Sequence, residues 1–320
     1  MTNSKVISTG GYLPKKVYDN FHMESIVDTS DEWILTRTGI KERHIAADGE
    51  LTTDLALKAS EDALKKSNLK KNQIDAIVMA TTTPDRTFPS SAVILQEKLG
   101  IGSSCFSFDV QAVCCGFIYA LDVADSFIKS KKAKNILVVG AETMSRLIDW
   151  KDRGSCILFG DGAGAVILQA TEETDTGIIA TKLHSDGQYV DFLHTDGGVS
   201  MNQISGKIRM KGSEIFKLAV NKMSECILEG LDKCNLKKED IDLLIPHQAN
   251  QRIINGIAKK LDLDEEKVIS VIAKHGNTSG ASIPLALDYA IRENKLKRGD
   301  LVVLEGLGGG LTWGSIILRW

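Results

Sequence analysis

A cysteine at position 114 stands where a short apolar run of strand character, 108–113, passes into a run of helical period after Gly116. A thiol at such a junction lies among free backbone N–H groups at the positive end of a helix dipole, which favours the thiolate. The position therefore predicts that Cys114 is a nucleophile. The alternative is that Cys114 and Cys115 are small buried hydrophobic residues, the commoner fate of a free cysteine.

Two polar side chains of the second half could act with this thiol. His247 follows an apolar run and is expected at a strand end, and Asn277 lies in a loop of small residues where a ligand can approach the backbone. If a malonyl thioester loses carbon dioxide, an enolate develops on the thioester oxygen. A neutral imidazole N–H and a carboxamide NH₂ can donate to that oxygen without quenching the carbanion. Taken singly, a loop histidine and a turn asparagine have ordinary structural explanations.

Acyl transfer from a thioester to Cys114 would also need donors for a tetrahedral oxyanion. The run Gly308-Gly309-Gly310 follows an apolar strand and offers backbone N–H groups that no side chain screens. We expect the N–H groups of Cys114 and Gly309 to serve as the two donors, and the loss of one such donor typically costs about a hundredfold or more in rate.

The elements that must position these residues repeat once along the chain. Apolar runs begin at 74, 136 and 164 in the first half and at 241, 301 and 314 in the second, so the first two runs start 62 and 60 residues apart. Continuous β-branched runs alternating with helical patterns indicate mostly parallel sheets covered by helices. The repeat predicts an α/β protein of two pseudo-twofold-related halves, 1–171 and 172–320.

The same repeat predicts where the catalytic loops lie. If Leu121 matches Ala286, then Cys114 corresponds to Ser279, and equivalent loops of the two halves should meet near the axis between them. Ligands prefer such points, where strand ends meet helix starts.

Composition narrows the class of protein. The chain has 320 residues, of which 43% are apolar and 25% charged, which is the composition of a globular protein. Its net charge of -3 gives no general reason to expect binding to nucleic acid or membrane. It shows no apolar signal core and no run of roughly 20 apolar residues, and we expect a cytoplasmic protein with reduced thiols. The six cysteines and six histidines show no metal-finger spacing, so no metal is expected.

Taken together, these segments resemble the β-ketoacyl-acyl-carrier-protein synthase III family. The resemblance runs from the first strand to Trp320 and implies a thiolase-like fold with layered αβαβα architecture, a homodimer, and a catalytic triad of Cys114, His247 and Asn277. It is carried by 109–117, 246–250, 276–279 and 308–314, together with 31–40 and 159–165.

The resemblance also implies the reaction. An acetyl group would pass from acetyl-CoA to Cys114, and malonyl-acyl-carrier protein would be decarboxylated with help from His247 and Asn277. The carbanion would then attack the acyl-cysteine and give acetoacetyl-carrier protein, the first step of fatty acid biosynthesis. This chemistry implies no cofactor beyond the acyl-CoA substrate.

Further residues carry over by position. Trp33, Arg37 and Arg153 would bind CoA, and Phe88 would reach across the dimer and limit the primer pocket. Ordinary packing is the alternative for the two aromatic residues. Carrier proteins are acidic, so basic residues near the mouth of the site would have a role in docking them. That these residues merely lie on solvent-exposed helix faces explains them equally well. The docking residues would be Arg252, Lys217, Lys259 and Lys260.

Departures from the family pattern concern the pocket. Cys115, Leu307 and Leu311 stand where many members have a small residue or aromatic residues. They remove no catalytic group, but they leave open which acyl primer is preferred.

Several rival functions share part of this set. A cysteine hydrolase would use Cys114 and His247 but has no need for Asn277, and a degradative thiolase usually has a second catalytic cysteine near the C-terminal glycines, where 304–320 contains none. The run 160–164 leads into a strand, whereas a dinucleotide fingerprint must open a helix. A relative that makes a methylglutaryl thioester or a secondary metabolite is the enzymatic alternative. A silent subunit that only binds carrier protein is disfavoured because the triad is complete.

Overall fold

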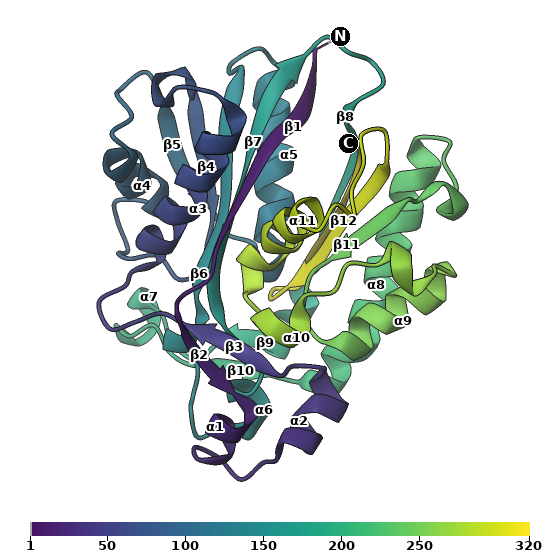
Figure 1. Cartoon of the computed structure of the whole chain (residues 1–320). Coiled ribbons are helices and arrows are strands. Elements are labelled where there is room, and N and C mark those ends of the chain that lie inside the picture. Colours follow the sequence, from purple (N-terminus) through teal and green to yellow (C-terminus); the bar gives the residue numbers. More distant parts are fainter. Residues whose placement is uncertain (1) are drawn as a thin grey trace.

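The computed structural model describes residues 2–320, which fold around two β-sheets that lie side by side in Figure 1. The first sheet takes all of its strands from the first half of the chain and the second from the second half. In order across the sheets, the strands are β1 (Asn3–Tyr12), β7 (Asp161–Thr171), β6 (Asn135–Thr143), β4 (Ala76–Ala80) and β5 (Phe106–Val110), and then β11 (Leu243–Pro246), β12 (Leu301–Gly308), β13 (Thr312–Arg319) and β8 (Gly177–Ser185).

Only part of each sheet is parallel, and the expectation of mostly parallel sheets is wrong. β4 runs parallel to β5 and β6, and β11 runs parallel to β12, whereas the remaining pairs in both sheets are antiparallel. β12 and β13 are joined across residues 309–311 without a helix, so the chain turns back antiparallel. The sequence does not distinguish parallel from antiparallel pairing because the central strands are buried on both faces, which makes them continuously apolar in either case.

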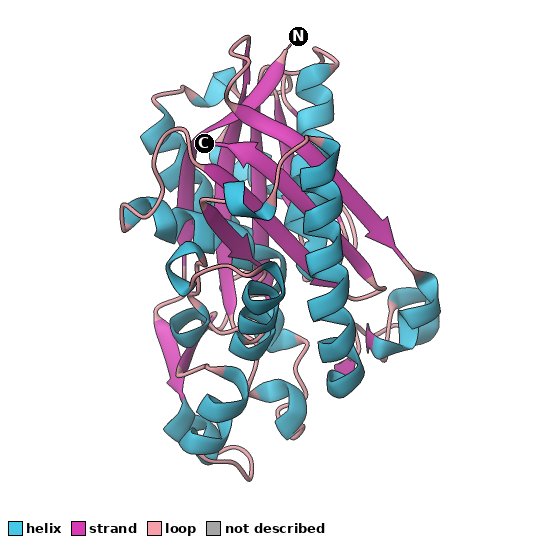
Figure 2. Cartoon of the chain, turned by 90° about the vertical axis from the view of Figure 1, so that its right-hand side faces the viewer, coloured by secondary structure: helices cyan, strands magenta, loops and turns pink. Residues whose placement is uncertain are grey.

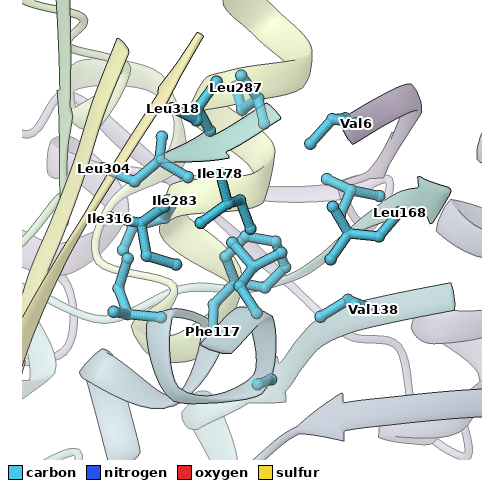
Figure 3. Packing of buried hydrophobic residues seen from close by; sticks show 14 of the residues in the cluster. Val6, Phe117, Val138, Leu168, Ile178, Ile283, Leu287, Leu304, Ile316 and Leu318 are labelled. Carbon is cyan, nitrogen blue, oxygen red and sulfur yellow. The ribbon is translucent and has the colours of Figure 1, made fainter. Parts of the chain in front are cut away.

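Five layers result from the packing of helices on both faces of both sheets. α5 (Gly116–Lys129) and α11 (Ser282–Arg292) form the middle layer, where Phe117 and Ile283 pack with Val138 and Leu304 (Figure 3). α3 (Thr52–Ser67) and α4 (Ser91–Leu99) cover the outer face of the first sheet. α8 (Gly212–Lys233) and α9 (Gln251–Leu261) cover the outer face of the second, and Figure 2 shows helices in front of its strands. The predicted layered αβαβα architecture is confirmed, while the boundary at 171/172 stays a prediction.

A group of short elements covers one end of both sheets, in the lower part of Figure 1. The fully buried Arg43 ties them together, because its guanidinium donates to the Tyr18 carbonyl, to Asn20 Oδ1 and to the Ile157 carbonyl at 2.8–3.0 Å. These elements are β2 (Lys16–Asp19), α1 (Asn20–Glu24), α2 (Asp31–Thr38), β3 (Glu42–Ile45), α6 (Arg153–Cys156), β9 (Leu193–Thr195), α7 (Val199–Asn202), β10 (Ile208–Met210) and α10 (Ile272–His275).

The correspondence between the halves differs by one residue from the expected one. α5 begins at Gly116 and α11 begins at Ser282, 166 residues later, and each follows a single 3₁₀ turn. Val113 therefore corresponds to Ser279, and both have a left-handed φ of 49°. Cys114 corresponds to Gly280, not to Ser279, because apolar helical periodicity does not fix an alignment to a single residue.

Candidate active site

Cys114 lies in the turn that joins β5 to α5. The turn is tight because Val113 adopts a left-handed φ of 49°, and the thiol that follows is 3% exposed. Cys115 behind it is completely buried against the middle layer. The strand, turn and helix predicted around Cys114 are therefore present, and only the first of the two adjacent cysteines lines a cavity.

The state of this thiol departs from the expectation of a stabilised thiolate. The pKa of Cys114 is raised to about 12, mainly by burial and to a smaller extent by the negative charge of Glu142, while the Ser279 side chain acts to lower it. Desolvation therefore outweighs the helix N-terminus. At neutral pH the thiol keeps its proton until a substrate arrives, so acylation requires a route for that proton.

His247 follows β11, and its backbone N–H donates to the Glu305 carbonyl of β12 at 2.7 Å. Its Nδ1 lies 2.6 Å from Ser282 Oγ, and the backbone N–H of Gln248 donates to the same oxygen at 3.4 Å. We assign the hydroxyl proton of Ser282 to Nδ1 on this basis, which leaves the imidazole proton on Nε2. Burial lowers the pKa of His247 to about 3, so the ring is a neutral N–H donor at physiological pH.

Asn277 is held by the first half of the chain. Its backbone N–H donates to the Leu158 carbonyl at 2.8 Å, and its own carbonyl accepts from the N–H of Gly160 at 3.0 Å. In the side chain, Oδ1 accepts from the backbone N–H of Ser279 at 2.9 Å. Because the carboxamide oxygen is occupied in this way, the NH₂ group is the end available to a ligand.

Two cavities meet at Cys114. The Trp33 cavity, of about 540 Å³, contains Cys114, His247 and Asn277 in one wall and opens toward Trp33 and Arg252. The Gln111 cavity, of about 1020 Å³, lies on the other side and is lined by Gln111, Gly309 and the loops 82–87 and 195–205. Cys114, Phe159 and Leu193 line both cavities. The thiol is therefore accessible from two directions, as an acyl-transfer nucleophile with a separate acyl pocket requires.

The glycines after β12 allow the Cys114 turn to lie against that strand. A Cβ at Gly308 would lie 2.6 Å from the Ala112 carbonyl oxygen and 2.8 Å from the backbone nitrogen of Cys114. Gly309 follows and lines the Gln111 cavity beside Cys114. The two backbone N–H groups expected to form an oxyanion hole are thus in neighbouring segments, and their role stays a prediction.

Gly308→Ala should displace Cys114 without unfolding the protein. The added methyl meets only backbone atoms, which cannot rotate away, so the turn must shift. A displacement of roughly 1 Å costs about a hundredfold in rate, and we expect that loss in acyl transfer to Cys114, measured by mass spectrometry. Gly102→Ala is the control, because a Cβ there meets nothing within 4 Å. A normal rate in Gly308→Ala would contradict the prediction.

Of the residues expected to bind CoA, Trp33 and Arg37 line the Trp33 cavity, and Arg153 lies beside Trp33 without lining it. Two guanidinium groups lie against the Trp33 ring, with Arg37 at 4.8 Å and Arg153 at 4.7 Å from its centroid. Arg153 also donates to the Asp28 carbonyl at 2.9 Å.

The residues expected to dock a carrier protein are not all in one place. Arg252 and Lys217 line the Trp33 cavity, and Arg252 stacks on Phe216 at 5.2 Å. Lys259 and Lys260 lie two turns further along α9 and do not line it. Lys260 donates to Asn221 at 2.9 Å and lies 3.8 Å from a carboxylate oxygen of Glu225.

Phe88 does not line either cavity of its own chain. It is 82% exposed, although its neighbours Arg86 and Thr87 line the Gln111 cavity. Its expected role in a primer pocket therefore requires a second copy of the chain.

Sequence reasoning missed Ser282 and Glu142, whose importance comes from long-range contacts. The run of small residues from Gly276 to Ser282 was the available signal for the first of them.

Two further findings bear on function. Among residues 2–320, no group of three or more histidine, cysteine, aspartate or glutamate side chains could hold a metal ion. Over the same residues, the structure contains no helix with the length and apolar character needed to cross a bilayer.

Comparison with known proteins gives consistent matches. Family models described as 3-oxoacyl-[acyl-carrier-protein] synthase III and its C-terminal part match residues 108–187 and 231–320. The chain is 57% identical over 321 residues to a β-ketoacyl-[acyl-carrier-protein] synthase III of Wolbachia pipientis wMel, with complete coverage of both chains. Among solved structures, the 3-oxoacyl-[acyl-carrier-protein] synthase III of Aquifex aeolicus VF5 matches with a TM-score of 0.95 at 52% identity, over 99% of this chain and 100% of that one. The corresponding Pseudomonas aeruginosa PAO1 enzyme matches with a TM-score of 0.94 at 42% identity, over 99% and 98% of the two chains.

Proposed function

The chain belongs to the β-ketoacyl-acyl-carrier-protein synthase III family of condensing acyltransferases, and from this membership we propose how its own residues start fatty acid synthesis. Enzymes of this family condense an acyl-CoA with malonyl-acyl-carrier protein. The observation that carries the proposal is that Cys114, His247 and Asn277 line one cavity, although they come from three separate segments of both halves.

The first half-reaction is acyl transfer to sulfur. Cys114 Sγ attacks the thioester carbonyl of acyl-CoA, most simply acetyl-CoA, and the N–H groups of Cys114 and Gly309 stabilise the tetrahedral oxyanion. Free CoA leaves through the Trp33 cavity, where Trp33, Arg37 and Arg153 hold its nucleotide end. The acyl chain extends into the Gln111 cavity. Exchange between two thioesters is nearly balanced in energy, so this step is reversible.

The second half-reaction is decarboxylation followed by carbon–carbon bond formation. Malonyl-acyl-carrier protein enters the cavity that CoA has left, and loss of carbon dioxide places negative charge on its thioester oxygen. His247 Nε2–H and the Asn277 NH₂ group donate to that oxygen, and neither is acidic enough to quench the carbanion. The carbanion attacks the acyl carbon on Cys114, the bond from that carbon to Sγ breaks, and 3-oxoacyl-acyl-carrier protein is released. The Cys114 thiolate then takes a proton from solvent. The proton of the Cys114 thiol ends on the departing CoA thiol, so the first half-reaction balances without a further reactant, and we propose no cofactor.

The partners follow from the same site. We propose a homodimer, because β5 forms an edge of the first sheet and lies near exposed apolar side chains. These are Phe88 at 82%, Val93 at 41% and Phe106 at 39% exposure. A second copy paired along this edge would cover them and bring its Phe88 to the Gln111 cavity. The cytoplasmic location stays a prediction from the sequence.

Mass spectrometry of the acyl-enzyme tests this function. We expect acetyl-CoA alone to add one acetyl group to the peptide that contains Cys114, and malonyl-acyl-carrier protein to remove it as acetoacetyl-carrier protein. A mixture of straight and branched acyl-CoA primers, offered together, should reveal which chain the pocket accepts. Label on Cys115 or Cys156, or hydrolysis without condensation, would overturn the proposal.

Charge reversal at Arg252 should weaken the binding of carrier protein more than the binding of CoA. Arg252 lies at the mouth of the Trp33 cavity, where an acidic partner would be attracted. We expect Arg252→Glu to raise the KM for malonyl-acyl-carrier protein about tenfold, with a smaller rise in the KM for acetyl-CoA, whose phosphates pass through the same cavity. Lys132→Glu is the control, because this exposed lysine follows the far end of α5. Equal effects of the two reversals would exclude specific docking at Arg252.

A further inference from the structure

Glu142 is a buried carboxylate that neither half-reaction uses. It lies near the end of β6, its side chain is 0% exposed, and its two oxygens accept hydrogen bonds from uncharged donors of both halves. Burial of a carboxylate is costly unless such bonds satisfy it, and here they tie several segments to one side chain. The donors are the Thr83 hydroxyl at 2.6 Å, the Thr82 N–H at 3.1 Å, the Ser279 hydroxyl at 3.2 Å and the Thr81 hydroxyl at 3.3 Å.

One of these donors, Ser279, also holds the side chain of Asn277. Its hydroxyl donates to Glu142 Oε1 at 3.2 Å, and its backbone N–H donates to Asn277 Oδ1 at 2.9 Å. Ser279 is completely buried, so bulk water does not replace the contact with Glu142. A line of hydrogen bonds therefore leads from β6 of the first half to the carboxamide whose NH₂ group is available to a ligand.

The backbone of Ser279 explains why this residue needs an anchor. Its φ is 49°, in the left-handed region, which is unfavourable for a residue with a Cβ. Such a conformation persists only where the surrounding contacts hold it. The hydrogen bond to Glu142 is one of these contacts. Without it, Ser279 can relax toward an ordinary φ, and its N–H then turns away from Asn277.

The turn that carries the nucleophile is held in a different way. Its Val113 has the same φ of 49° as Ser279, and Gly308 occupies the place of Glu142, 166 residues further along the chain. Because residue 308 has no side chain, that turn packs on the backbone of β12 itself. Glu142 instead holds its turn through a side-chain hydrogen bond. The carboxylate therefore serves the turn that orients Asn277, and the shared fold of the halves does not require it.

We propose that Glu142 and Ser279 are positioning residues that hold the Asn277 carboxamide for decarboxylation, an inference that rests on the proposed function. Neither Glu142 nor Ser279 lines the Trp33 cavity or the Gln111 cavity, so both act through Asn277 and not on the substrate. Thr82 and Thr83 do line the Gln111 cavity, and both donate to Glu142. The same carboxylate thus fixes the wall of the acyl cavity relative to the donor in the other cavity.

Release of carbon dioxide from malonyl-acyl-carrier protein, measured with enzyme acetylated beforehand, tests this role. Acetylation blocks the Cys114 sulfur, so an effect of Ser279 on the free thiol does not enter the measurement. We expect Ser279→Ala to decarboxylate at least about tenfold more slowly, since a displacement of roughly 1 Å can cost about a hundredfold. Glu142→Gln replaces one accepting oxygen with an NH₂ group and should slow the same step.

Two further variants separate positioning from a general structural role. Ser279→Gly also lacks the hydroxyl, but glycine adopts a left-handed φ without strain and keeps the N–H, so it should recover most of the rate that Ser279→Ala loses. In an Asn277→Ala background, Ser279→Ala should have no further effect beyond about twofold, because residues that act through one group are not additive. A residue needed only for stability would give neither result.

Ser60→Ala is the control, because it removes another fully buried hydroxyl, one that donates to the Ala56 carbonyl at 2.7 Å, and it should decarboxylate normally. An unchanged rate in Ser279→Ala, a rate in Ser279→Gly no higher than in Ser279→Ala, or an equal loss in the Asn277→Ala background would overturn the positioning role. The Ser279 variants decide the question even where Glu142→Gln fails to fold. Absence of an acetyl label on wild-type Cys114 would instead overturn the proposed function.

Discussion

Cys114→Ser should remain folded and lose the acyl-enzyme. The side chain is 3% exposed and serine has nearly the same shape as cysteine, so the turn between β5 and α5 should keep its geometry. An alcohol ionises far less readily than a thiol, and Cys114 is already disfavoured as an anion because burial raises its pKa to about 12. We expect condensation to fall by about 10⁴-fold or more, as when a covalent nucleophile is removed. Intact-protein mass spectrometry after exposure to acetyl-CoA should show no added acetyl group.

The other cysteines provide the controls for this experiment. Cys156 is fully buried in the cluster beneath α2, and burial raises its pKa to about 11. Cys105 is 5% exposed and packs with α3 and α4 on the outer face of the first sheet. Cys156→Ser and Cys105→Ser should both acylate at the wild-type rate. Loss of label in either variant, with label retained in Cys114→Ser, would place the nucleophile elsewhere.

Much of this site could be predicted from the sequence because local signals specify it. A strand run that passes into a helical run placed Cys114 in a turn, and an apolar run that ends at a polar residue placed His247 at a strand end. The three glycines from Gly308 predicted backbone N–H groups that no side chain screens. The structure adds that Gly308 lies close to the Cys114 turn, since a Cβ there would lie 2.8 Å from the Cys114 nitrogen. Each of these features depends on residues close together in the chain.

The remaining features depend on contacts between distant segments. Ser282 and His247 are 35 residues apart, and Glu142 and Ser279 are 137 residues apart, so no local pattern relates them. The raised pKa of Cys114 depends on burial from both halves, which the dipole of a single helix does not reveal. Strand direction was also hidden, because strands buried on both faces are apolar whether they pair parallel or antiparallel.

His247→Ala and Asn277→Ala should separate the two half-reactions. Neither side chain is required for the attack of Cys114 on acyl-CoA, so acetyl transfer should stay within about threefold of wild type. Each donates one hydrogen bond to the developing enolate, and removal of one such donor typically costs about 10²–10³-fold. We expect that loss in the release of carbon dioxide from malonyl-acyl-carrier protein, measured with enzyme acetylated beforehand. In the double variant, the fold-reduction in decarboxylation rate should be smaller than the product of the two single reductions, because both donors act on one oxygen.

The dependence on pH distinguishes a neutral imidazole donor from an imidazolium. Burial lowers the pKa of His247 to about 3, below its ordinary value of 6.5, so the ring stays neutral as the pH falls through the range where histidines usually titrate. Protonation of His247 in the unfolded chain then lowers the free energy of unfolding progressively below about pH 6.5, but decarboxylation per folded enzyme should not change there. Ser282→Ala removes the hydroxyl 2.6 Å from Nδ1 that fixes the tautomer, and it should slow decarboxylation while leaving acylation intact. If the decarboxylation rate rises as His247 becomes protonated, the enolate is stabilised by a cation. The proposed role of His247 as a neutral hydrogen-bond donor would then be wrong.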